Sequence, residues 1–124
     1  MIIWLASYPK SGNTYVRAFL SAYYFSESGE FDFSQISKID QFPHEKFFKT
    51  KASNINEASK QWVPIQREIN KDKKIKFFKT HSFLGNYQGN QFTSAETTLG
   101  AIYIVRDPRN VLTSLKNHYS FDDD

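Results

Sequence analysis

Apolar residues form two kinds of pattern along this chain. Three short stretches rich in apolar residues, at residues 2–7, 75–80 and 101–105, are each followed by polar or turn-forming residues. Runs of this length are typical of strands buried in a parallel sheet. We therefore expect three such strands, followed by loops that start at Tyr8, His81 and Arg106.

Between these runs, apolar residues recur at helical spacing. Residues 14–25 carry them at positions 15, 16, 19, 20, 23 and 24, and residues 56–70 form a second helical stretch that Pro64 interrupts or kinks. A third helix is expected to begin at Pro108, because proline suits the first helical position. Its predicted inner stripe is Val111, Leu112, Leu115 and Tyr119.

Strands that alternate with helices predict an α/β fold with a mostly parallel sheet flanked by helices. Residues 27–50 and 85–94 are polar and lack a clear period. We expect a loop with short helices in the first segment and an irregular loop in the second. Because ligands bind beyond the carboxyl ends of the strands in such sheets, the three loops named above are the candidate site.

Composition narrows the class of protein. The chain has 124 residues, enough for one domain with a buried core. It has no cysteine, which excludes disulfides, thiolate catalysis and cysteine zinc sites. A formal net charge of +3 suits an anionic ligand but is too small for nucleic-acid binding. No apolar stretch suffices for a membrane span or a signal peptide, so we expect a cytoplasmic protein.

The first loop has the residues of an anion-binding site. Free backbone N–H groups at the start of a helix attract phosphate or sulfate. Lys10 adds a positive charge, Gly12 permits close approach, and Ser11 adds a hydroxyl, as does Thr14. The Walker A pattern of nucleotide triphosphatases is not matched, because Lys10 precedes Gly12. From this loop alone, an ordinary turn with a surface lysine remains an equal alternative.

The second loop begins with a possible general base. Lys79, Thr80 and His81 stand at the end of the second apolar run. Histidine titrates near neutral pH, so it can take a proton from an attacking hydroxyl. A lone histidine is more often structural, and a carboxylate such as Glu45 is the alternative base. The three histidines lack metal-ligand spacing, and no metal site is expected.

The third loop places an arginine where a phosphate could bind. Arg106 follows the last apolar run, and its planar guanidinium can bind a phosphate through two hydrogen bonds. Ser114 lies about two helical turns further on and faces back toward the same end of the sheet. Taken alone, the segment from Arg106 to Pro108 fits a capped turn with a surface ion pair.

Together these segments resemble sulfotransferases that use 3′-phosphoadenosine 5′-phosphosulfate (PAPS). Residues 8–15 read Y-P-K-S-G-N-T-Y and are similar to the family's 5′-phosphosulfate loop, Y-P-K-S-G-T-T-W. Asn13 replaces the usual Thr but keeps a polar side chain and a backbone donor. Tyr15 replaces the usual Trp and keeps an aromatic face, which lies near the adenine in the family. Residues 79–81 resemble the family's K-T-H segment, and residues 106–114 its 3′-phosphate motif, R-[ND]-P-x-[DN]-x-x-x-S.

The resemblance implies a P-loop-like, three-layer fold and transfer of a sulfuryl group from PAPS, without a metal, to a hydroxyl or amine. It implies that Lys10, Lys79 and His81 serve catalysis, with His81 as the base. It also implies that the donor nucleotide is bound by Lys10, Ser11, Gly12, Asn13, Thr14, Tyr15, Arg106 and Ser114. The acceptor would be a small molecule, a glycan or a lipid, and neither its identity nor the oligomeric state is readable from the sequence.

Family members are commonly about twice as long as this chain. We therefore expect residues 1–124 to form the N-terminal portion of a single sulfotransferase domain that is incomplete at its C-terminus. A catalytically inert module that binds PAPS or another nucleotide is the first alternative function. A P-loop kinase acting on a small molecule is the second, and the missing Walker pattern argues against it.

Overall fold

The computed structural model describes residues 1–119 and contains a four-stranded sheet in which all strands are parallel. The strand order β2-β3-β1-β6 places β1 in the middle of the sheet. The predicted mostly parallel sheet is thereby confirmed. Its strands are β1 (Ile2–Ser7), β2 (Asp40–Gln41), β3 (Lys76–Thr80) and β6 (Thr98–Ile104).

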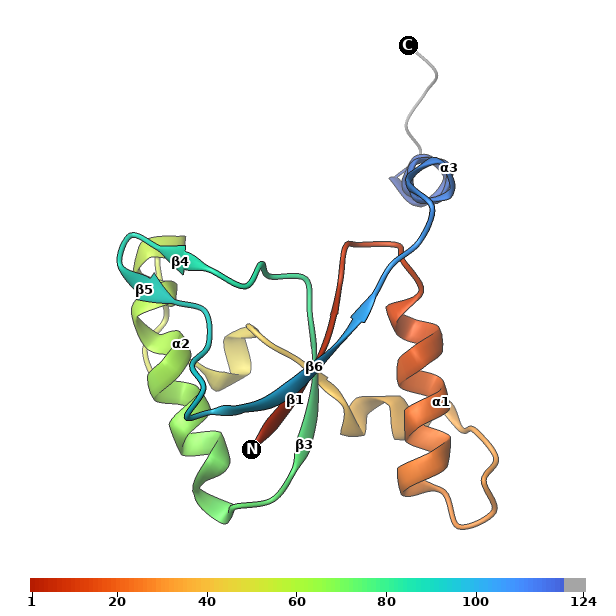
Figure 1. Cartoon of the computed structure of the whole chain (residues 1–124), viewed down its shortest axis with the longest axis horizontal. Coiled ribbons are helices and arrows are strands. Elements are labelled where there is room, and N and C mark those ends of the chain that lie inside the picture. The colour runs from red at the N-terminus through yellow and green to blue at the C-terminus, as the bar shows by residue number, and fades with distance from the viewer. Residues whose placement is uncertain (120–124) are drawn as a thin grey trace.

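Helices cover both faces of the sheet and give three layers (Figure 1). The helix α1 (Asn13–Phe25) lies on one face and α2 (Ile55–Ile69) on the other. Within the described residues, three short 3₁₀ helices complete the connections: η1 (Phe33–Lys38), η2 (Glu45–Phe47) and η3 (Asn70–Asp72). Because β1 is flanked by β3 and β6, the loops that follow these three strands meet at one end of the sheet.

The core lies between the sheet and α2 and is rich in aromatic rings. Side chains alternate between the two faces of a strand, so Ile2 and Trp4 point to the same face of β1. The Trp4 ring lies 5.1 Å from that of Phe92 and 5.8 Å from that of Phe42, measured between centroids. Trp62 of α2 packs on the same cluster and is 4% exposed. This core fixes the positions of β1 and β3.

The helix α2 continues through Pro64 instead of ending there. At its start the Asn54 side chain accepts a hydrogen bond from the Glu57 backbone N–H at 3.0 Å, which caps the first turn. Burial of Trp62 and Ile65 against the sheet offsets the helical hydrogen bond that proline removes.

Two short elements were not expected from the sequence. The strand β2 pairs with the second half of β3, and a hairpin of β4 (Asn86–Tyr87) and β5 (Asn90–Gln91) lies within the predicted irregular loop. Its turn residues, Gln88 and Gly89, both have positive φ, which is typical of a tight two-residue hairpin turn. Strands of two residues are too short to show a hydrophobic period.

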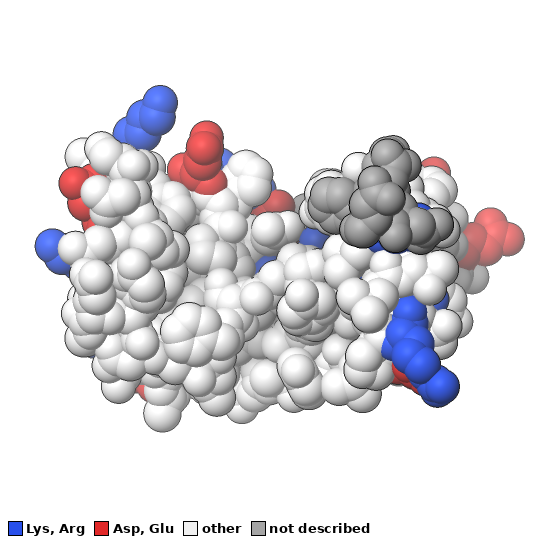
Figure 2. Space-filling model, turned by 90° about the horizontal axis from the view of Figure 1, so that it is seen from above, with Lys and Arg blue, Asp and Glu red and all other residues white. Residues whose placement is uncertain are grey.

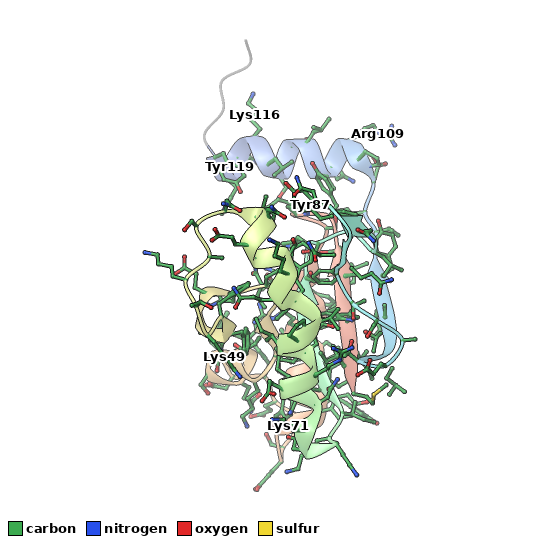
Figure 3. The ribbon with its side chains drawn as sticks, turned by 90° about the vertical axis from the view of Figure 1, so that its left-hand side faces the viewer. Lys49, Lys71, Tyr87, Arg109, Lys116 and Tyr119 are labelled. Atoms are coloured by element: carbon green, nitrogen blue, oxygen red, sulfur yellow. The ribbon has the colours of Figure 1, made fainter. Side chains whose placement is uncertain are left out.

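The helix α3 (Pro108–Tyr119) begins at Pro108 as predicted and lies across the carboxyl end of the sheet (Figure 3). Val111 is 6% exposed, whereas Leu112 is 67% and Tyr119 is 57% exposed. The predicted inner stripe is therefore wrong for Leu112 and Tyr119. The reason is that α3 rests on loops and not on the face of the sheet, so only a narrow side of it is covered.

Candidate functional site

The loop between β1 and α1 is shaped to present backbone N–H groups. Lys10 and Gly12 both have left-handed backbone conformations, with φ of 63° and 97°. Gly12 is the N-cap residue of α1 and has no side chain with which to cap the helix. The first N–H groups of α1 are therefore free to bind an anion, and the helix dipole strengthens that attraction.

Side chains of this loop point in two directions. Thr14 and Tyr15 are exposed, and Tyr15 is 78% accessible. Asn13 is buried, and its Nδ2 donates hydrogen bonds to the Leu5 carbonyl at 2.9 Å and to the Ser7 Oγ at 3.1 Å. Asn13 thus ties the start of α1 to the end of β1, which leaves its backbone N–H, and not its side chain, as the candidate group for binding an anion.

His81 is held at the end of β3 by the end of β1. Its Nδ1 lies 2.7 Å from the Ser7 carbonyl oxygen and 3.3 Å from the Ser7 Oγ. A carbonyl oxygen only accepts, so in the neutral ring Nδ1 carries the proton and donates it to Ser7. The remaining nitrogen, Nε2, then has a free lone pair, which is the state that a general base requires.

Lys79 lies on the face of β3 that is turned toward α1, two residues before His81. Burial lowers the pKa of Lys79, and the nearby positive charge of Arg17 lowers it further. Arg17 itself donates hydrogen bonds to the carbonyls of Ile36 and Ile39 at 2.9 and 2.6 Å. Burial also lowers the pKa of Arg17, and the nearby charge of Asp40 only partly opposes that effect. Two partly desolvated cations side by side would be stabilised by a further anion placed between them.

Arg106 joins the third loop to the first. Its Nη1 donates a hydrogen bond to the Lys10 carbonyl oxygen at 3.0 Å. The surface ion pair considered for this segment does form, but between Asp107 and Arg109, at 2.7 Å. Arg109 points away from the body of the molecule at the first turn of α3 (Figure 3). Arg106 is therefore the arginine that contacts the candidate anion-binding loop.

A cavity of about 380 Å³ lies beside Arg106, between the first loop, β6 and α3. Tyr8, Ser11 and Val111 are among the residues that line it. Ser114 is one turn beyond Val111 on the same side of α3, which turns it toward this end of the sheet, but it does not line the cavity. The structure thus brings the Arg106 side chain to the Lys10 backbone and leaves Ser114 at the margin.

A second and larger cavity, of about 700 Å³, lies on the other side of the first loop and is lined by His81. Tyr8 and Tyr103 line both cavities, so the two spaces adjoin. Seen from above, this end of the molecule is hollowed, and Lys and Arg side chains occupy only small parts of the surface around the hollow (Figure 2).

Sequence reasoning did not identify Ser7 and Arg17 as parts of the site. Ser7 acts through its carbonyl group, which every residue has, so no sequence signal could mark it. Arg17 gave a weak signal, because it stands among the apolar residues of a predicted helix, four residues after Asn13.

Two features are absent from residues 1–119, the part of the chain that the structure describes. Among these residues, no group of three or more histidines and carboxylates is arranged to hold a metal ion. No helix of this part of the chain has the length and apolar character needed to cross a membrane.

The chain was also compared with known proteins. A family model described as the sulfotransferase domain matches residues 2–122, which include all three loops of the candidate site. No curated protein matches the sequence. The family match covers nearly the whole chain, and the structure has the α/β architecture that the resemblance implied. The chain therefore belongs to the sulfotransferase domain family.

Proposed function

We propose that this chain transfers a sulfuryl group from PAPS to a hydroxyl or amine and releases adenosine 3′,5′-bisphosphate. The observation that carries the proposal is the hydrogen bond from Arg106 to the Lys10 carbonyl. It joins two cationic loops that begin at the carboxyl ends of neighbouring strands, β1 and β6, so one ligand with two anionic groups could engage both. PAPS is such a ligand, because it carries a 5′-phosphosulfate and a 3′-phosphate.

The donor would bind across the first and third loops. The N–H groups at the start of α1, the Lys10 ammonium and the Thr14 hydroxyl would hold the 5′-phosphosulfate. Arg106 would bind the 3′-phosphate, with Ser114 completing that contact from α3. The exposed ring of Tyr15 would lie against the adenine.

The reaction needs a base on the acceptor and positive charge at the leaving group. The acceptor oxygen or nitrogen attacks sulfur in line, and the bond from sulfur to the bridging phosphate oxygen breaks. That oxygen keeps the bonding electron pair, and Lys10 stabilises its charge. His81 Nε2 takes the proton of the acceptor, since Nδ1 is committed to Ser7. Lys79 adds positive charge near the transferred group.

Geometry favours His81 over a carboxylate base. Among residues 1–119, none that lines the cavity beside His81 is an aspartate or glutamate, and Glu45 does not line it. Glu45 begins the exposed helix η2, which follows the edge strand β2.

Calorimetry with adenosine 3′,5′-bisphosphate, AMP and ATP in the absence of magnesium tests the proposal. We expect the bisphosphate to bind more tightly than AMP, because only the bisphosphate engages both Lys10 and Arg106. Arg106→Ala should remove most of this preference. Equal affinities for bisphosphate and AMP in the parent protein would refute the assignment of Arg106. Bisphosphate binding without any transfer from PAPS would favour the inert binding module.

A further inference from the structure

The cavity beside His81 has the size and position of a ligand site. Its volume of about 700 Å³ lies within the range of about 300–1,000 Å³ that is usual for small-molecule sites. It is bounded by β1, β3 and β6 on one side and by residues 82–98 on the other. It adjoins the cavity beside Arg106, so an occupant of the larger cavity would face a donor bound at Arg106.

The lining of this cavity carries no fixed charge. All fifteen lining residues are described by the structure, and none of them is Lys, Arg, Asp or Glu. Trp4 and Phe92 are each 3% exposed and form its interior, whereas Phe83 and Leu84 are 61% and 86% exposed at its border. Large apolar side chains that face water around a cavity favour an apolar occupant.

Several polar atoms of the lining are already bonded to one another. Trp4 Nε1 donates to the Thr98 Oγ1 at 2.8 Å, and that oxygen lies 2.6 Å from the Thr93 Oγ1. The Thr80 Oγ1 accepts a hydrogen bond from the Ser82 backbone N–H at 3.1 Å. These pairings leave the interior with little capacity to solvate a charged or strongly polar ligand.

We infer that this cavity binds the acceptor and that the acceptor is an uncharged, largely apolar alcohol or phenol, and not a charged glycan. The inference rests on the proposed function, since only a sulfotransferase site has an acceptor. A charged group would lose its hydration here without meeting an opposite charge. A hydroxyl group next to His81 would instead find a hydrogen-bond acceptor in Nε2 while the apolar remainder fills the cavity.

A matched pair of probes tests the class of acceptor. The probes are 4-phenylphenol and 4′-hydroxybiphenyl-4-carboxylate, which differ by one charged group, with N-acetylglucosamine as a polar uncharged comparison. Calorimetry on the protein with adenosine 3′,5′-bisphosphate present should show 4-phenylphenol binding on the order of tenfold or more tightly than either of the others. With PAPS in place of the bisphosphate, 4-phenylphenol should be sulfated faster than the carboxylate or the sugar.

Two substitutions on β6 locate the binding. Ala101 pairs with Trp4 in the parallel register and lines the cavity, whereas Ile102 pairs with Leu5 and lies on the opposite face. Ala101→Phe should fill the cavity and weaken 4-phenylphenol binding on the order of tenfold or more, with bisphosphate affinity unchanged. Ile102→Phe adds a ring to the same strand and should change neither affinity. If circular dichroism shows that Ala101→Phe does not fold, Ala101→Leu replaces it.

The outcomes distinguish a failure of the inferred acceptor class from a failure of the proposed function. Equal binding of the phenol and its carboxylate, tighter binding of the sugar, or insensitivity to the Ala101 substitution would overturn the acceptor class. Bisphosphate binding without phenol binding would overturn it as well and would leave the proposed function standing. Phenol binding without bisphosphate binding would refute the proposed function, and the assignment of the occupant as an acceptor would fail with it.

Discussion

Replacing Asn13 tests whether its side chain organises the first loop from within. In the structure its Nδ2 donates to the Leu5 carbonyl and to the Ser7 Oγ, and the residue is 5% exposed. Asn13→Ala removes both hydrogen bonds, whereas Asn13→Asp keeps the shape of the side chain and replaces the two donors by a buried carboxylate oxygen. The two variants therefore separate the effect of lost contacts from that of lost volume.

The expected loss of folding stability follows from these two hydrogen bonds. Each buried hydrogen bond contributes about 1 kcal/mol net, so Asn13→Ala loses about 2 kcal/mol. The Asn13 Oδ1 is buried without a partner among the described residues, so its removal recovers part of that loss. We expect a net loss of about 1–2 kcal/mol. An unfolding entropy of about 2.1 cal/mol/K per residue over 124 residues makes 1 kcal/mol equivalent to about 4 °C, so Tm should fall by about 4–8 °C.

Thermal unfolding followed by circular dichroism at pH 7 provides the assay. Asn13→Asp should destabilise the fold more than Asn13→Ala, because a buried carboxylate would face the Leu5 carbonyl, which cannot donate, and would have only the Ser7 hydroxyl as a possible donor. Asn117→Ala, on the exposed side of α3, is the matched control and should shift Tm by about 2 °C or less. If Asn13→Asp were as stable as the parent protein, the inward hydrogen bonds of Asn13 would be ruled out.

Three further predictions concern the charged side chains. Lys10→Ala should lower the transfer rate on the order of a hundredfold or more. The control is Lys73→Ala, because Lys73 also has a left-handed conformation but lies at the opposite end of the sheet, and this variant should leave the rate unchanged. Equal rates in both variants would make Lys10 peripheral. Arg106→Ala should weaken bisphosphate binding on the order of tenfold by calorimetry. Arg109→Ala should leave that affinity unchanged, because Arg109 is paired with Asp107 at the surface. Equal losses of affinity would contradict the assignment of Arg106 to the 3′-phosphate. Lys79→Met should raise Tm at pH 7 and lower the transfer rate. Because burial lowers the pKa of Lys79, the unfolded chain binds more protons than the folded chain as the pH approaches 10.5. The gain in Tm from Lys79→Met should therefore shrink as the pH rises toward 10.5. A gain in Tm that is independent of pH would refute the role of the Lys79 charge.

The elements that place the site could be predicted from the sequence, because β1, β3 and the start of α3 follow local patterns. Short stretches rich in apolar residues marked the strands, and Pro108 marked the first residue of α3. The register between strands is a tertiary property, so the sequence could not reveal that the Ser7 carbonyl meets His81 or that Arg106 reaches the first loop.

The direction of side chains was also beyond sequence reasoning. Asn13 was expected as a polar group of the anion-binding loop, and its side chain is turned into the protein. Leu112 was expected inside and is exposed, because helical periodicity shows which residues share a face but not what that face meets. The ligand roles of the site residues remain predictions.

The central claim is that the ends of β1, β3 and β6 form one site, in which Lys10 and Arg106 bind the donor and His81 activates the acceptor. The most direct test measures two quantities on His81→Ala: transfer from PAPS to a panel of alcohols, phenols and amines, and calorimetric affinity for adenosine 3′,5′-bisphosphate. Loss of a general base should lower turnover by roughly a hundred- to ten-thousandfold while the affinity stays within about twofold of the parent value. Turnover that persists in His81→Ala, or affinity that collapses together with turnover, would contradict the claim.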